Sequence, residues 1–167
     1  MAPVIKDDDL VLAESTAIVQ YIAHKHGGGR LTVAPESKNY ADYLYWLQFN
    51  NNSQTGLFVK VAISGAGSDY DGGIVGKIMR RRTEGLFQQM NDHLAVHTYL
   101  AGDEFTLADV MSAFVVVTLP SIVGETCFDR FPNIRRYAEQ ITRRPAWQKA
   151  MDIAGPNKKS AQNNRVW

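Results

Sequence analysis

Apolar residues near the start of the chain form two short runs separated by a polar turn. The runs cover residues 2–5 and 10–12, and residues 6–9 between them are one Lys and three Asp. Because aspartates favour turns and short Val-, Ile- and Leu-rich runs favour strands, this pattern predicts a β-hairpin. A two-stranded hairpin is marginal in water, so we expect it to pack against another part of the chain.

Helical periodicity dominates the rest of the sequence. Ser15 is expected to cap the first helix, and a triple glycine at residues 27–29 ends it. A loop is expected over residues 64–76, which hold five glycines. Apolar residues spaced three and four apart predict helices over residues 15–26, from about 36 past 48, over 78–100 and 111–119, and from 132 and 145 onward.

Thr106 and Asp109 form the sharpest local signal. Thr106 can accept from the amide of Asp109, and the Asp109 carboxylate can reach back to the amide of Thr106, which is a capping box. Phe105 and Val110 flank it as a hydrophobic staple. The following helix is apolar nearly all round, so we expect it to lie at the buried centre of a helical bundle.

Composition narrows the class of protein. The 167 residues are 45% hydrophobic and 21% charged, with a net charge of +1, which suits a globular chain and predicts no nucleic acid or membrane partner. The single cysteine, Cys127, excludes an internal disulfide and is expected to be a small buried apolar residue. His24 and His26 point to different helix faces, so we expect no metal site. The start of the chain does not resemble a signal peptide, and we expect a cytoplasmic protein.

Three segments carry a resemblance to a known family. Residues 3–5 and 12–22, residues 100–109, and residues 131–134 with 144–147 resemble, in order and spacing, the motifs of cytosolic glutathione S-transferases. The resemblance implies a mainly α fold, in which a glutathione-transferase-like helical bundle follows part of a thioredoxin-like α/β domain, a β-hairpin plus one helix. The segments implied are 1–29 for the thioredoxin-like part, 30–36 for a linker, 37–154 for the all-α domain and 155–167 for a polar tail.

The resemblance also implies a glutathione site. The pair Glu14–Ser15 matches the family residues that hold the γ-glutamyl end, the Ser taking its carboxylate and the acid its ammonium. Pro3 matches the family's cis-proline, which turns the backbone of Ala2 toward the cysteinyl amide of glutathione. From spacing alone, a helix cap is the favoured role of Ser15, and the family resemblance is what favours binding. Helix starts attract anions, which agrees with the implied role of the pair.

A hydrophobic substrate would lie between the first long helix and the central helix. Phe49, Asn50, Met111 and Phe114 are the candidates, and core packing is the alternative role for each. The family's catalytic Tyr, Ser or Cys lies in a segment that precedes the proline matching Pro3, and in this sequence Met1 stands two residues before it. We therefore expect the usual catalytic residue to be missing, and which residue could replace it is unknown.

Three hypotheses about function stay open. The first is a glutathione S-transferase that joins glutathione to a small hydrophobic electrophile, or uses it as the cofactor of an isomerisation. The second is a non-catalytic binding or scaffolding relative, and the third is a truncated product of an ordinary enzyme. Family members dimerise, and exposed strand edges invite pairing between chains, so we expect a homodimer in which strands could be exchanged.

Overall fold

The computed structural model describes residues 3–49, 73–118, 120 and 125–154. The chain begins with a β-hairpin, β1 (Val4–Asp7) and β2 (Leu10–Ala13), paired antiparallel with Val4 opposite Ala13 and Asp7 opposite Leu10. Asp8, in the turn, has a positive φ of 52°, which Asp tolerates better than most residues. The hairpin prediction is therefore confirmed.

The first helix differs in detail from its prediction. Regular α1 (Ser15–Tyr21) opens into a π-helical turn, η1 (Ile22–His26), before the triple glycine. The prediction that Ser15 caps this helix is wrong: the cap position belongs to Glu14, and Ser15 is already helical. Glu14 has φ 74° and ψ 112°, so the chain turns sharply there and leaves no extended residue between strand and helix. The wider π turn also changes the buried face, since Ala23 is buried and Ile22 is 45% exposed.

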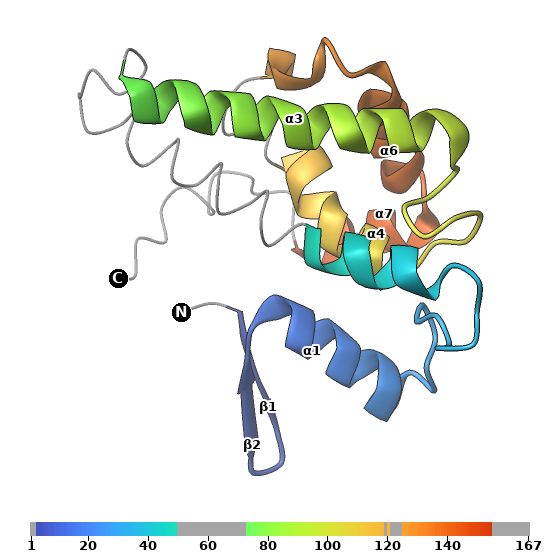
Figure 1. Ribbon diagram of the computed structural model, residues 1–167. Helices are drawn as coiled ribbons and strands as arrows, with labels where there is room; N and C mark the ends of the chain where they lie inside the picture. The colour runs from blue at the N-terminus through green and yellow to red at the C-terminus, as the bar shows by residue number, and fades with distance from the viewer. Residues whose placement is uncertain (1–2, 50–72, 119, 121–124, 155–167) are drawn as a thin grey trace.

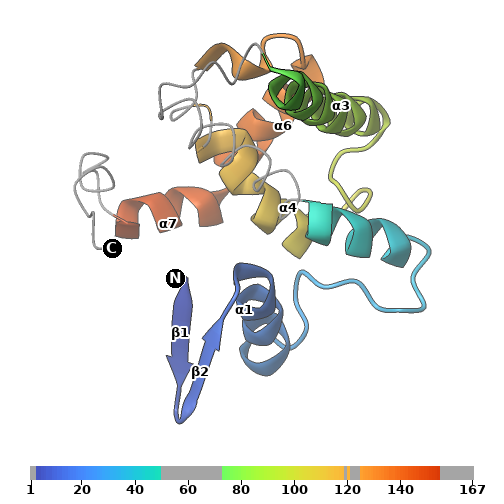
Figure 2. The same ribbon diagram turned by 60° about the vertical axis from the view of Figure 1, so that its left-hand side comes forward.

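The remaining elements form a helical bundle (Figures 1 and 2). A helix over residues 40–49 starts later than predicted, because residues 35–39 form turns. The long helix α3 starts within the end of the predicted loop and ends before the predicted residue 100. The elements are α3 (Ile74–Val96), α4 (Leu107–Ala113) with its π-helical continuation η3 (Phe114–Thr118), the short 3₁₀ turn η4 (Glu125–Phe128), α6 (Pro132–Thr142) and α7 (Pro145–Ala154).

The core of the bundle lies among α3, α4, α6 and the helix over residues 40–49. Figure 1 shows α3 lying across α6, and Asn91 ties the two together by accepting from the backbone amide of Asn133 and from its side chain. Most of α4 is buried, which confirms the prediction of a central helix. The largest fully buried apolar side chains, all below 2% exposed, are Tyr137, Leu47, Met90, Leu94, Leu100, Ile134, Ile141 and Val115.

The capping box at the start of α4 is confirmed. The amide of Thr106 donates to Oδ2 of Asp109 at 2.7 Å, and the Thr106 hydroxyl accepts from the first turn of the helix. The turn that leads to it is held at Leu100, whose amide donates to Oδ1 of Asp109 at 3.0 Å. The carbonyl of Leu100 accepts from Nε2 of His93 at 2.9 Å. Leu100 therefore joins the last part of α3 to the first turn of α4.

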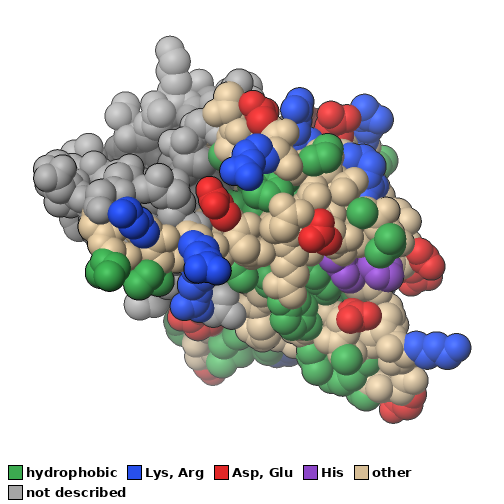
Figure 3. Space-filling model, turned by 45° about the horizontal axis from the view of Figure 1, so that its top comes forward, with side chains coloured by type: hydrophobic (Ala, Val, Ile, Leu, Met, Phe, Trp, Pro, Cys, Tyr) green, Lys and Arg blue, Asp and Glu red, His purple; other side chains and the backbone are tan. Residues whose placement is uncertain are grey.

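The hairpin and α1 lie together on one side of the bundle (Figure 2). α1 contacts α4, and the amide of Leu107 donates to the carbonyl of Leu31 in the connecting segment at 2.8 Å. Side chains of both charges are scattered over the face in Figure 3. Among the described residues, no helix is both long enough and apolar enough to cross a membrane. The molecule is thus mainly α, with one small antiparallel sheet at its N-terminal side.

Candidate functional site

At the corner between β2 and α1, one residue of the predicted site, Glu14, has an unusual backbone conformation. Glu14 is exposed and holds a positive φ of 74°, a region that bulky residues rarely adopt. Such backbone strain is characteristic of ligand clamps and active sites. Within the described residues, the Ser15 hydroxyl and the Glu14 carboxylate have no hydrogen-bond or ion-pair partner. Both polar groups are therefore free to meet a ligand.

Pro3 lies at the same end of the hairpin as this corner. The ladder ends with the pair Val4–Ala13, so Pro3 and Glu14 are the next residues on the two strands. Pro3 is exposed. Ala2, the fourth predicted contact for glutathione, lies outside the described residues. The structure thus brings together Pro3, Glu14 and Ser15 out of the four predicted residues.

The helix start supplies the electrostatics of the corner. The first amides of a helix have no intrahelical acceptor, and no side chain caps them in α1. These amides and the positive end of the helix dipole favour a carboxylate, while the neighbouring Glu14 favours an ammonium group. The arrangement therefore suits a zwitterionic, amino-acid-like end of a ligand.

The predicted residues for a hydrophobic substrate occupy the core or pack against it. Phe49 is 4% exposed and its ring lies 4.7 Å from that of Trp46. Met111, in α4, is 7% exposed, and Phe114, at the start of η3, is half-buried. Asn50 lies outside the described residues. Their part in binding a substrate stays a prediction.

An open hollow of about 420 Å³ lies between the helix over residues 40–49 and α3. Phe49 borders it, whereas Met111 and Phe114 do not. Its remaining lining residues are Leu44, Tyr45, Gln48, Arg82 and Leu86. Among the described residues, no three His, Cys, Asp or Glu lie close enough together to hold a metal ion.

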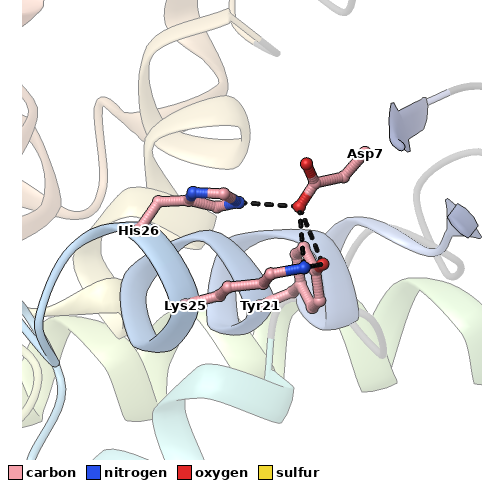
Figure 4. A network of polar contacts seen from close by, with 4 residues as sticks. All are labelled: Asp7, Tyr21, Lys25 and His26. Atoms are coloured by element: carbon pink, nitrogen blue, oxygen red, sulfur yellow. Dashed lines mark hydrogen bonds and ion pairs between the residues drawn. The ribbon is translucent and has the colours of Figure 1, made fainter. Parts of the chain in front are cut away.

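A polar network at the opposite end of the hairpin is absent from the sequence-based predictions. Oδ2 of Asp7 accepts from the Tyr21 hydroxyl at 2.8 Å and pairs with Nε2 of His26 at 2.8 Å and Nζ of Lys25 at 3.3 Å (Figure 4). The only sequence signal is the spacing of Tyr21, Lys25 and His26 near one helix end. Nothing in that spacing identifies Asp7 as the shared partner.

Comparison with known proteins places this geometry in a family. The family model for the glutathione S-transferase C-terminal domain matches residues 67–145. Glutathione S-transferase 3 of Zea mays is 32% identical over 159 residues, which cover 89% of this chain and 69% of the maize protein. Glutathione S-transferase GstB of Escherichia coli K12 is 30% identical, and the match covers 92% of this chain and 74% of that protein.

Solved structures agree with these relatives. A glutathione S-transferase from Actinobacillus pleuropneumoniae superposes with a TM-score of 0.78 at 29% identity, over 90% of this chain and 67% of that one. A sphingomonad glutathione S-transferase, solved in complex with glutathione, gives a TM-score of 0.71 at 25% identity, over 93% of this chain and 75% of that one. The hairpin, α1 and the helical bundle thus share the fold of glutathione S-transferase structures over most of this chain. The chain belongs to the glutathione S-transferase family.

Proposed function

We propose that this chain binds glutathione at the corner between β2 and α1. The γ-glutamyl carboxylate accepts from the Ser15 hydroxyl and the first amides of α1, and the ammonium pairs with Glu14. Pro3 borders the same end, and the backbone of Ala2 meets the cysteinyl amide. The observation that carries the proposal is the positive φ of Glu14 beside an uncapped helix start and an unpartnered Ser15. The glutathione-bound sphingomonad relative supports the same ligand.

The reaction class we propose is addition of glutathione to a small hydrophobic electrophile. The thiol loses its proton and a sulfur–carbon bond forms. The displaced electron pair leaves with a leaving group or passes to an adjacent atom that takes up a proton. Phe49, Asn50, Met111 and Phe114 are the residues proposed to contact the electrophile.

A non-catalytic binding or scaffolding role is the second candidate. Unperturbed thiols titrate at about 8.5, so a transferase must favour the thiolate. A carboxylate such as Glu14 close to the sulfur would have the opposite effect. The Tyr21 hydroxyl donates a 2.8 Å hydrogen bond to Asp7, which lies at the turn end of the hairpin, away from Glu14 and Ser15. These observations favour binding without efficient turnover by this chain.

Titration calorimetry with glutathione on the 167-residue chain tests the binding proposal. Ser15→Ala is expected to weaken binding by about 1–3 kcal/mol, the scale of a lost hydrogen bond to a charged group. Ser37→Ala, in the exposed connecting segment, is the matched control and should bind like the parent. Equal affinity of the two variants, or no binding by the parent, would contradict the proposed site.

A conjugation assay with an aromatic electrophile separates the two candidates. The second candidate predicts a rate close to the uncatalysed background alongside measurable binding. Robust turnover would instead support the transferase and direct attention to Tyr43 or Asn50 as thiol activators.

We also propose that the protein acts in the cytoplasm as a homodimer. The hairpin exposes Val4, Leu10 and Val11, by 51%, 41% and 64% respectively, and the helix over residues 40–49 exposes Leu44 and Tyr45. These apolar surfaces support association of two copies. Light scattering at micromolar concentration tests it, and a monomer would contradict it.

A further inference from the structure

The hairpin is attached to α1 at two opposite ends. At one end the chain itself makes the connection, through Ala13, Glu14 and Ser15. At the other end Asp7, the last residue of β1, meets three side chains from the end of α1 and from η1 (Figure 4). α1 therefore runs back along the hairpin, from the corner at Glu14 to the turn beside Asp7.

The Asp7 contacts form a closed cluster. Its Oδ2 accepts from the Tyr21 hydroxyl and pairs with His26 and Lys25, while Nζ of Lys25 also donates to the Tyr21 hydroxyl at 2.7 Å. The hydrogen bonds from Tyr21, His26 and Lys25 lower the pKa of Asp7 to about 2. The same contacts with Tyr21 and Asp7 raise the pKa of Lys25. Asp7 is thus ionised, and Lys25 charged, throughout the neutral pH range.

Among the described residues, the hairpin has no fully buried apolar side chain that would hold its angle to α1. Ile5 and Leu12 lie opposite each other in the register and are half-buried, whereas Val4, Val11 and Ala13 are exposed. A single half-buried apolar pair buries little surface and therefore contributes little resistance to rotation of the hairpin about the corner. The Asp7 cluster lies at the far end of the hairpin, where a small rotation about the corner produces the largest displacement.

We propose that Asp7 is a positioning residue for glutathione binding. By fixing the turn end of the hairpin to Tyr21, Lys25 and His26, it fixes the angle at Glu14. That angle sets Pro3, which directly precedes β1, against the start of α1, so both can face one ligand. This inference rests on the proposed glutathione site, because Asp7 itself lies at the end of the hairpin away from Glu14 and Ser15.

Asp7→Asn in the full chain tests the inference. The variant keeps the shape of the side chain and removes the charge that draws the three partners together. Asp9→Asn is the matched control, since Asp9 is exposed in the same turn and contacts no partner among the described residues. Asp7→Asn should weaken glutathione binding about fivefold in calorimetry, the scale of residues that act through a network, and Asp9→Asn should bind like the parent.

Two further measurements separate positioning from general destabilisation. Hydrogen exchange should accelerate at the amide of Ile18, which donates to the carbonyl of Glu14 at 2.9 Å, in Asp7→Asn but not in Asp9→Asn. Thr106→Ala, which weakens the distant capping box, should lower the melting temperature and leave glutathione affinity unchanged. If Asp7→Asn is unfolded at the assay temperature, Tyr21→Phe, which removes one donor, decides instead and should weaken binding about twofold.

The outcomes distinguish the two proposals. If the parent does not bind glutathione, the proposed function fails and this inference fails with it. If the parent binds and Asp7→Asn matches Asp9→Asn in affinity and in exchange at the Ile18 amide, the inference alone is wrong. Weaker binding and faster exchange specific to Asp7→Asn support it.

Discussion

The hydroxyl of Tyr137 donates a 2.6 Å hydrogen bond to Oδ1 of Asp109, and both residues are 0% exposed. The bond joins the middle of α6 to the first turn of α4. Burial raises the pKa of Asp109, an effect that its four donors oppose, and burial together with Asp109 raises the pKa of Tyr137 far above its ordinary value. The carboxylate thus serves as a capping group and as a contact between helices.

Tyr137→Phe is expected to lower the free energy of unfolding by about 1–3 kcal/mol, because it leaves a buried carboxylate oxygen with one donor fewer. Denaturant titration measures the loss. Tyr45→Phe removes a hydroxyl from a side chain 46% exposed and should change stability little. Equal effects of the two substitutions would mean that the buried bond contributes nothing.

Removing the Thr106 or the Asp109 side chain of the capping box should lower the free energy of unfolding by different amounts. Thr106→Ala removes one helix-start bond and should destabilise the protein by about 1 kcal/mol. Asp109→Ala leaves Leu100, Thr106 and Tyr137 with unpartnered buried donors and should cost about 3 kcal/mol or more. Urea unfolding of both variants checks the order, and a smaller loss for Asp109→Ala would contradict the four-bond role of this carboxylate.

Asp7 should make the hairpin attachment sensitive to acid. Its pKa falls from 3.8 to about 2 on folding, so the unfolded chain binds the proton more readily between these values. The stabilisation is fully present above pH 3.8 and is lost as the pH falls through about 2. A carboxyl titration followed by NMR should give a midpoint well below 3.8 for Asp7, and Tyr21→Phe should raise it. An ordinary midpoint in the parent would show that the cluster is not formed.

His93 should make the bundle sensitive to mild acid. Burial, with a smaller effect of His97, lowers the pKa of His93 below 6.5, although the bond to Leu100 and the charges of Asp42 and Asp109 act in the opposite direction. The unfolded chain therefore takes up the proton first, and stability falls as the pH drops below 6.5.

Comparison of the parent with His93→Gln tests this dependence. The Gln amide can still donate to Leu100 but does not titrate. Between about pH 7.5 and 5.5, the parent should lose more unfolding free energy than the variant. His24→Gln, at an exposed position, should follow the parent. Parallel curves for the parent and His93→Gln would contradict the prediction.

The features of the fold that depend on short stretches of chain are the ones that the sequence predicts. The hairpin and the capping box follow from residues within about ten positions of each other. The end of the first helix is not predictable in this way, because a periodicity argument assumes a regular α-helix and does not anticipate the π turn at residues 22–26. In a regular α-helix Ile22 would lie on the same face as the buried Ile18, whereas in the structure Ala23 is buried and Ile22 is 45% exposed.

The candidate site was predictable only in part, for a related reason. The Glu14–Ser15 pair was identifiable through the family resemblance, whereas the positive φ of Glu14 depends on how the hairpin and α1 pack. The Asp7 cluster joins residues up to 19 positions apart through side-chain directions. Tyr137 and Asp109 lie 28 positions apart, on helices whose relative placement the sequence pattern does not encode.

The bond from the amide of Leu107 to the carbonyl of Leu31 has an evolutionary consequence. Both groups belong to the backbone, so the connecting segment can change most of its side chains and still dock on α4. Proline at position 107 would break this bond, because it lacks the backbone amide that donates to Leu31. Proline is ordinarily welcome at the first position of a helix, which Leu107 occupies. Leu107 is itself 4% exposed, so among descendants of this sequence position 107 should keep a buried apolar residue and exclude the imino acid that helix statistics favour there.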